Sequence, residues 1–137
     1  KAEEINLNAL ISTFPEKTWH LPRVTDPESM TFYEYRADDP LETGEFGVQE
    51  PLTSAKPLNI ETPIDFAIIP ALMADYEGYR LGYGKGFYDR FLSQVTIKTA
   101  IVALPQCMVV ELLPKEPFDL PVNHVITEIN VIGCPNI

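Results

Sequence analysis

Residues 78–90 read GYRLGYGKGFYDR and join a glycine-rich loop to the start of a helix. Three glycines alternate at positions 82, 84 and 86, and Phe87 and Phe91 then lie four residues apart, on one face of a helix. The apolar run 64–69, ended by Pro70, predicts a strand before the loop. Glycines let a backbone approach a ligand, and a helix N-terminus offers unpaired N–H groups and partial positive charge. The order strand, loop, helix therefore predicts a phosphate site.

The spacing of this loop excludes two common nucleotide motifs. The third glycine comes one residue too early for the dinucleotide fingerprint G-x-G-x-x-G. Lys85 is followed by Gly86 rather than by Ser or Thr, so a Walker P-loop is also excluded. The alternative interpretation is a mobile surface loop whose glycines serve only tight turns.

Charged side chains around the loop suit a polyphosphate. Asp89 falls in the first helical turn, where the helix dipole favours a carboxylate. Beside bound phosphates the same carboxylate requires a cation between them, and Mg²⁺ is commonly held by carboxylate and phosphate oxygens. Arg80 and Lys85 can neutralise phosphate charge, the first with a planar fork and the second as a point charge.

The segment RLGYGKGFYDR, following IDFAIIPALMAD, resembles the signature of the 5-formyltetrahydrofolate cyclo-ligase family, also called 5,10-methenyltetrahydrofolate synthetases. The glycine-rich signature is specific. Weaker matches extend in family order along almost the whole chain: Glu4-Ile5-Asn6, Leu21–Val24, Met30–Tyr33, Phe46–Pro51, Gln106, Leu113-Pro114, Asp119 and Thr127-Glu128.

The resemblance implies ATP- and Mg²⁺-dependent conversion of 5-formyltetrahydrofolate, which can be polyglutamylated, to 5,10-methenyltetrahydrofolate with release of ADP and phosphate. It implies catalytic roles for Arg80, Lys85 and Asp89. ATP binding is assigned to Arg80, Leu81, Gly82, Tyr83, Gly84, Lys85, Gly86, Phe87 and Tyr88. Folate binding is assigned to Glu4, Met30, Tyr33, Tyr83, Gly84, Lys85, Gly86 and Phe87, and Mg²⁺ to Asp89 and Asp119.

Several of these residues have simpler interpretations. Glu4 lies in the first turn of an expected helix over residues 2–13, where an acid is favoured. Met30 and Tyr33 fall on an alternating strand, where such side chains usually pack in a core. Asp119, in a proline-bounded turn, can bond its own backbone, and Asp75 suits a turn or a ligand-orienting role equally.

The sequence is also compatible with two rival functions. One is a sugar-phosphate isomerase or CoA-transferase relative, which predicts no ATP requirement and is supported by fold analogy alone. The other is a non-catalytic folate- or nucleotide-binding protein that has lost turnover.

Composition limits the class of partner. The 137 residues carry a formal net charge of −10, which argues against nucleic acid, and no apolar run approaches the ~20 residues of a membrane helix. Cys107 and Cys134 lack a CxxC partner, which favours a reducing, cytoplasmic compartment, and Cys107 is expected to be buried. A monomer is expected. The resemblance implies that a chain starting at Lys1 lacks the family's N-terminal helix, whose basic cluster contacts ATP in the family, and that the numbered chain is a fragment of a longer product.

Periodicity predicts a single α/β domain over residues 1–137 with a mainly parallel sheet flanked by helices. The resemblance implies a three-layer architecture of the NagB/RpiA/CoA-transferase type. Residues 37–63 show no periodicity and are expected to form an irregular pocket wall, and 64–69 is expected at the buried centre of the sheet. Besides helix 2–13, the expected elements are strands 19–24, 30–36, 64–69, 99–104 and 122–127 and helices 87–92 and 106–112.

Overall fold

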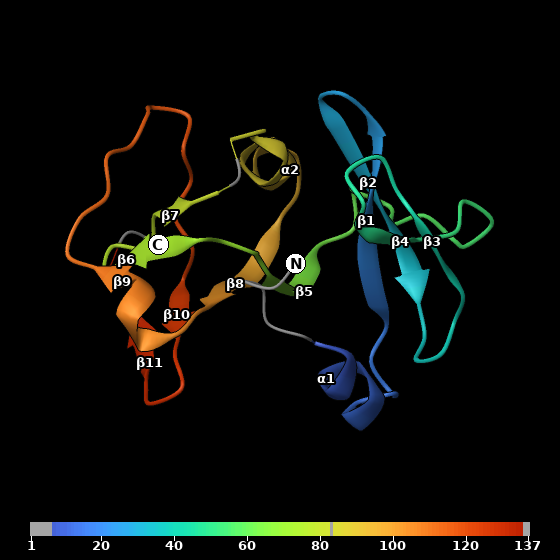
Figure 1. Cartoon of the computed structure of the whole chain (residues 1–137), viewed down its shortest axis with the longest axis horizontal. Helices are drawn as coiled ribbons and strands as arrows, with labels where there is room; N and C mark the ends of the chain where they lie inside the picture. Colours follow the sequence, from blue (N-terminus) through green and yellow to red (C-terminus); the bar gives the residue numbers. More distant parts are fainter. Residues whose placement is uncertain (1–6, 83, 136–137) are drawn as a thin grey trace. The chain divides into compact units, whose positions relative to one another are not determined.

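The computed structural model describes residues 7–82 and 84–135, which form two compact units dividing after Asn59. Figure 1 shows the elements of both units. The expected single domain over residues 1–137 stays a prediction.

Over residues 7–59, the first unit consists of one short helix and two hairpins. Its elements are α1 (Asn8–Thr13), β1 (Trp19–Asp26), β2 (Ser29–Tyr35), β3 (Leu41–Thr43) and β4 (Gln49–Pro51). β1 pairs antiparallel with β2, and β3 pairs antiparallel with β4. The predicted strands 19–24 and 30–36 are confirmed as the β1–β2 hairpin. Because this sheet has two strands, Pro22 lies on an edge strand, as expected of a residue without an N–H donor.

The β3–β4 hairpin falls in a region that was expected to be irregular. A buried carboxylate attaches it to β1: Glu50 is 5% exposed and accepts the N–H of Val24 at 2.9 Å. Arg23 donates to the carbonyl of Pro51 at 2.9 Å and forms an ion pair with Glu42. Strands of three residues carry too little periodicity to be predicted from sequence.

The second unit contains two sheets and the helix that follows the glycine-rich loop. In chain order its elements are β5 (Ile64–Ile68), β6 (Met73–Asp75), β7 (Arg80–Leu81), α2 (Phe87–Gln94), β8 (Ile97–Ala103), the 3₁₀ helix η1 (Gln106–Met108), β9 (Val109–Val110), β10 (His124–Ile126) and β11 (Val131–Gly133). The larger sheet has the order β11-β10-β8-β5 and the smaller β7-β6-β9.

Both sheets of the second unit are mixed. β5, β8 and β10 run parallel, as do β6 and β9, whereas β10–β11 and β6–β7 are antiparallel. The mainly parallel sheet expected from sequence is therefore limited to the β10-β8-β5 part, and helices are few in the described residues. The three-layer architecture stays a prediction.

The core of the second unit lies on the larger sheet. Fully buried side chains include Val102 on β8, Val125 on β10 and Val122 just before it, each 0% exposed. Tyr88 and Leu92 of α2 pack against this cluster. The predicted helix 87–92 and strands 99–104 and 122–127 are thus confirmed, with shifted ends.

Three sequence predictions are wrong in this unit. β5 is an edge strand of the described sheet rather than its centre. Its neighbouring residues Asp65 and Phe66 point to opposite faces and are 89% and 49% exposed. The predicted helix 106–112 ends as η1 at Met108, because the β-branched pair Val109-Val110 pairs as β9 with β6. Cys107 lies on η1 and is exposed rather than buried.

Candidate active site

A tight hairpin positions the start of the glycine-rich loop. β6 and β7 pair through Ala74 with Arg80, and the N–H of Asp75 donates to Tyr79 at 2.9 Å. The loop therefore leaves from β7, and not directly from the carboxyl end of β5 as the sequence suggested. Leu81, the last residue of β7, is 46% exposed.

The loop glycines differ in what they require. Gly84 and Gly86 have φ of +87° and +69°, conformations that favour glycine. A Cβ on Gly82 or Gly84 would meet no atom within 4 Å, so ligand groups can approach the backbone there. Lys85, between Gly84 and Gly86, is exposed, and its carbonyl accepts a hydrogen bond from Nη2 of Arg90 at 2.8 Å.

Helix α2 begins directly after this loop. Gly86 is its N-cap residue and provides no side-chain hydrogen bond to the first turn. Such a helix start favours a bound anion. Phe91 is 6% exposed and fixes the helix, while Tyr88 packs against the core and the Arg90 guanidinium lies 5.3 Å from the Phe87 ring centre.

Arg80 and Asp89 form a partly buried ion pair beside the loop. Arg80 Nη2 lies 3.2 Å from Asp89 Oδ1, and the two side chains are 6% and 21% exposed. Arg80 Nη1 also donates to the carbonyl of Leu120 at 3.3 Å, and the N–H of Leu120 donates to Asp89 Oδ1 at 3.3 Å. Arg80 is thus directed at Asp89 and Leu120, which orients the carboxylate.

The second metal candidate, Asp119, lies next to this pair along the chain. Its Oδ2 accepts the N–H of Glu116 at 2.8 Å, and its own N–H donates to Glu116 at 3.1 Å. The turn role considered from sequence is therefore present. Asp119 directly precedes Leu120, whose N–H donates to Asp89, but the Asp119 carboxylate itself bonds Glu116 within its turn.

Two carboxylates suit Mg²⁺, which is held by one or two carboxylates with waters and substrate phosphates. Within residues 7–82 and 84–135, no group of three or more His, Cys, Asp or Glu side chains could hold a metal ion. A Mg²⁺ site at Asp89 and Asp119 therefore stays a prediction.

The folate residues expected in the first unit lie on one strand. Met30 and Tyr33 are both half-buried on β2. Their separation of three residues puts them on opposite faces of the strand, so they do not form one stacking platform. Glu4 and Tyr83 lie outside the described residues.

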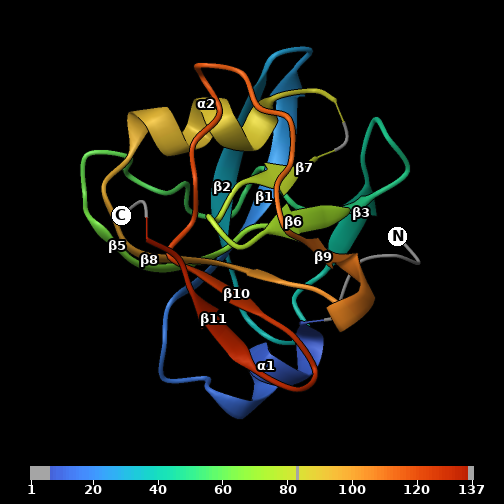
Figure 2. The same cartoon turned by 90° about the vertical axis from the view of Figure 1, so that its left-hand side faces the viewer.

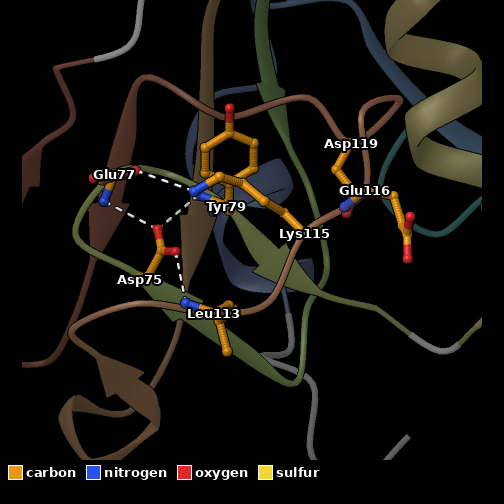
Figure 3. A network of polar contacts seen from close by, with 7 residues as sticks. All are labelled: Asp75, Glu77, Tyr79, Leu113, Lys115, Glu116 and Asp119. Carbon is orange, nitrogen blue, oxygen red and sulfur yellow. Dashed lines mark hydrogen bonds and ion pairs between the residues drawn. The ribbon is translucent and has the colours of Figure 1, made fainter.

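Asp75 is the main polar residue whose role the sequence left open. It is 0% exposed, and its carboxylate accepts three backbone N–H groups, as Figure 3 shows. One donor is Leu113, 38 residues away. The turn role of Asp75 was predictable, but its long-range bond had no sequence signal.

The chain is similar to one family of known proteins. The sequence profile described as 5-formyltetrahydrofolate cyclo-ligase family matches residues 3–128. A 5-formyltetrahydrofolate cyclo-ligase of Haemophilus influenzae is 35% identical over 130 residues, covering 90% of this chain and 69% of the relative. One of Escherichia coli K12 is 33% identical over 101 residues, covering 72% and 56%.

A solved structure agrees with these matches. The NMR structure of Aquifex aeolicus 5,10-methenyltetrahydrofolate synthetase is 35% identical with a TM-score of 0.81, covering 98% of this chain and 68% of that chain. The chain spans from about half to about two thirds of the length of these relatives. Among the described helices, none has the length and apolar character to cross a bilayer.

Proposed function

This chain belongs to the 5-formyltetrahydrofolate cyclo-ligase family, and from that membership we propose that it converts 5-formyltetrahydrofolate to 5,10-methenyltetrahydrofolate with ATP. The observation that carries the site assignment is the Arg80–Asp89 pair beside the glycine-rich loop. It presents an oriented carboxylate at the start of α2, where a helix favours phosphate.

The chemistry requires an activated leaving group. The formyl oxygen on N5 is a poor leaving group, so it takes the γ-phosphoryl group of ATP and ADP is released. N10 then attacks the formyl carbon, loses its proton, and the carbon–oxygen bond breaks to release phosphate. No protein nucleophile takes part, so catalysis consists of positioning and charge neutralisation.

We assign these tasks to residues of the second unit. The backbone of residues 82–86 and the Lys85 ammonium bind the ATP phosphates, and Arg80 holds Asp89 in place while adding positive charge. Asp89 and Asp119 would hold Mg²⁺, which supplies charge neutralisation at the phosphates. Contact with the folate is proposed for Tyr83, Gly84, Lys85, Gly86 and Phe87 of the same unit. The assignment of Glu4, Met30 and Tyr33 to the folate stays a prediction.

Three further features of the proposal concern the enzyme as a whole. The substrate is proposed to include polyglutamylated forms, bound through local positive charge on an acidic chain. The enzyme is proposed to act as a monomer and in the cytoplasm, where two cysteines without a CxxC partner stay reduced.

The test follows the absorbance of the methenyl product with and without ATP and Mg²⁺. Band growth only with both present supports the activity. Asp89→Asn should lower kcat by at least about 100-fold, because charge stabilisation of the transition state is lost. Asp65→Asn is the matched control, since that carboxylate is 89% exposed and pairs only loosely with Lys98 at 3.4 Å.

Contrary results separate the alternatives. Unchanged turnover in Asp89→Asn would remove this carboxylate from the mechanism. Calorimetric binding of 5-formyltetrahydrofolate without any band growth would instead favour a binding protein that has lost turnover.

A further inference from the structure

The connection between β9 and β10 crosses the hairpin that carries Arg80. Residues 111–121, called the strap from here on, have no helix or strand. Figure 2 shows this connection, in orange, passing in front of α2 and β7. The whole connection, residues 111–123, reaches the length at which loops without helix or strand are uncommon in compact units and usually either functional or disordered.

Asp75 fastens the strap to the hairpin at the strap's first half. Its Oδ1 accepts the N–H groups of Glu77 and Tyr79, both at 3.0 Å, which shapes the β6–β7 turn. Its Oδ2 accepts the N–H of Leu113, also at 3.0 Å. One carboxylate oxygen thus bonds the hairpin and the other bonds the strap (Figure 3).

A second, more exposed contact lies beside this one. Lys115 Nζ is 3.4 Å from Glu77 Oε1 and 4.5 Å from the centre of the Tyr79 ring. The Lys115 side chain is 36% exposed, so this contact strengthens the attachment only modestly.

The far end of the strap meets the proposed active site. Leu120 bonds both Arg80 and Asp89, and immediately beyond the strap the N–H of Val122 donates to Gly78 at 2.8 Å. The hairpin therefore holds the strap at Leu113 and again at Leu120, with Asp119 between these points.

Through these contacts, the position of Asp75 can affect the positions of Arg80 and Asp89 in the proposed active site. A buried carboxylate is stable only when it is paired or hydrogen-bonded, and three N–H donors satisfy Asp75. Burial raises the pKa of the Cys134 thiol, and the nearby Asp75 carboxylate raises it further.

We propose that Asp75 is a positioning residue for this enzyme: by tying Leu113 to the turn before Arg80, it sets the place of the strap and hence of Asp119 and Leu120 against Asp89. The proposal rests on the proposed function. We expect its consequence to fall on MgATP, because the strap contacts Arg80 and Asp89, which are assigned to ATP and metal.

Asp75→Asn is the sharpest variant. The amide keeps one carbonyl oxygen for hydrogen bonds but turns an N–H group toward either Leu113 or the hairpin donors, so one attachment is lost. We expect the KM for MgATP to rise by about 10- to 100-fold, the scale of small misplacements in an active site. The KM for 5-formyltetrahydrofolate should change less than about twofold, and Asp65→Asn should match the unaltered chain.

Hydrogen exchange gives a readout that needs no turnover. Peptides from the strap should exchange faster in Asp75→Asn than in Asp65→Asn, while peptides from β8 keep their protection. Unchanged exchange in the strap would overturn the proposal. The proposal would also be overturned if kcat and the KM values of both substrates changed to the same extent, because such a change would indicate a general loss of structure.

Two further arms keep the outcomes distinct. If Asp75→Asn does not fold, Lys115→Met is tested instead, because it removes the outer contact between the strap and the hairpin. The KM for MgATP should then rise by about 2- to 5-fold, which corresponds to the free energy of an exposed cation–π contact. No rise would overturn the proposal. If the unaltered chain shows no turnover, the proposed function fails, and MgATP binding by calorimetry decides instead. Weaker binding in Asp75→Asn supports the positioning role, and equal binding rejects it.

Discussion

At the scale of single residues, we expect His20 to make the stability of the first unit depend on pH. It lies on β1 directly opposite Glu34 of β2. Burial lowers the pKa of His20, Glu34 opposes this change and Lys56 adds to it. In the window just below the ordinary histidine value of about 6.5, the unfolded chain binds more protons than the folded one. The free energy of unfolding should therefore fall as pH drops from 7 through this window.

Urea unfolding of the unaltered chain and of His20→Gln at several pH values checks this prediction. The glutamine variant lacks the titrating group, so its stability should fall less over the same window. His124 and all carboxylates are shared by the two chains and cancel in the comparison. Parallel pH curves would show that protonation of His20 does not differ between the folded and unfolded states.

At the scale of elements, the β6–β7 turn depends on one glycine. Gly78 is buried with φ of +93°, and a Cβ there would lie 2.3 Å from the carbonyl oxygen of Val122. Gly78→Ala combines a strained backbone with a clash against main chain, so it should cost at least about 2 kcal/mol of unfolding free energy. Gly133→Ala on β11 is the control, because its Cβ would meet nothing within 4 Å.

Thermal or urea unfolding measures both glycine variants. A loss in Gly78→Ala no larger than in Gly133→Ala would mean that the strap end at Val122 moves away easily. Such freedom would also weaken the case for a fixed strap, so this measurement bears on the function of the hairpin.

Elements that the sequence predicted are those with enough residues to show a period. Helix α2 and strand β8 have eight and seven residues, and their apolar spacing was readable. β6, β7 and β9 have two or three residues each, too few for a period, and their pairing is set by tertiary contacts. The edge position of β5 likewise depends on strand order, which one strand does not encode.

In the candidate site, too, the features that are local in sequence were predictable and the long-range contacts were not. The glycine-rich loop and Asp89 were predicted because loop, helix start and carboxylate are adjacent in sequence. The contacts of Leu120 with Arg80 and Asp89 join residues that lie 40 and 31 positions apart. No local pattern indicates such pairs, so the role of Arg80 in orienting Asp89 could be seen only in the folded chain.

At the scale of the whole molecule, charge balance is the dominant feature. The chain has twenty acidic residues and ten basic residues. Ion pairs such as Lys98–Asp65, with side chains 69% and 89% exposed, contribute little to stability. An anionic substrate must therefore reach a locally positive site on a molecule whose overall field repels it.

This repulsion also opposes folding, because the folded chain holds like charges closer together than the unfolded chain. Added salt shortens the screening length from about 10 Å at 0.1 M to about 3 Å at 1 M. The unfolding free energy in urea should therefore rise with NaCl, by about 1 kcal/mol, the scale of an exposed ion pair.

The double variant Glu45→Gln, Glu111→Gln changes two exposed acids and brings the net charge from −10 to −8, so its salt dependence should be flatter. A stability that falls with salt would mean that the attractive pairs, including the partly buried Arg80–Asp89 pair, outweigh the repulsion among the acids.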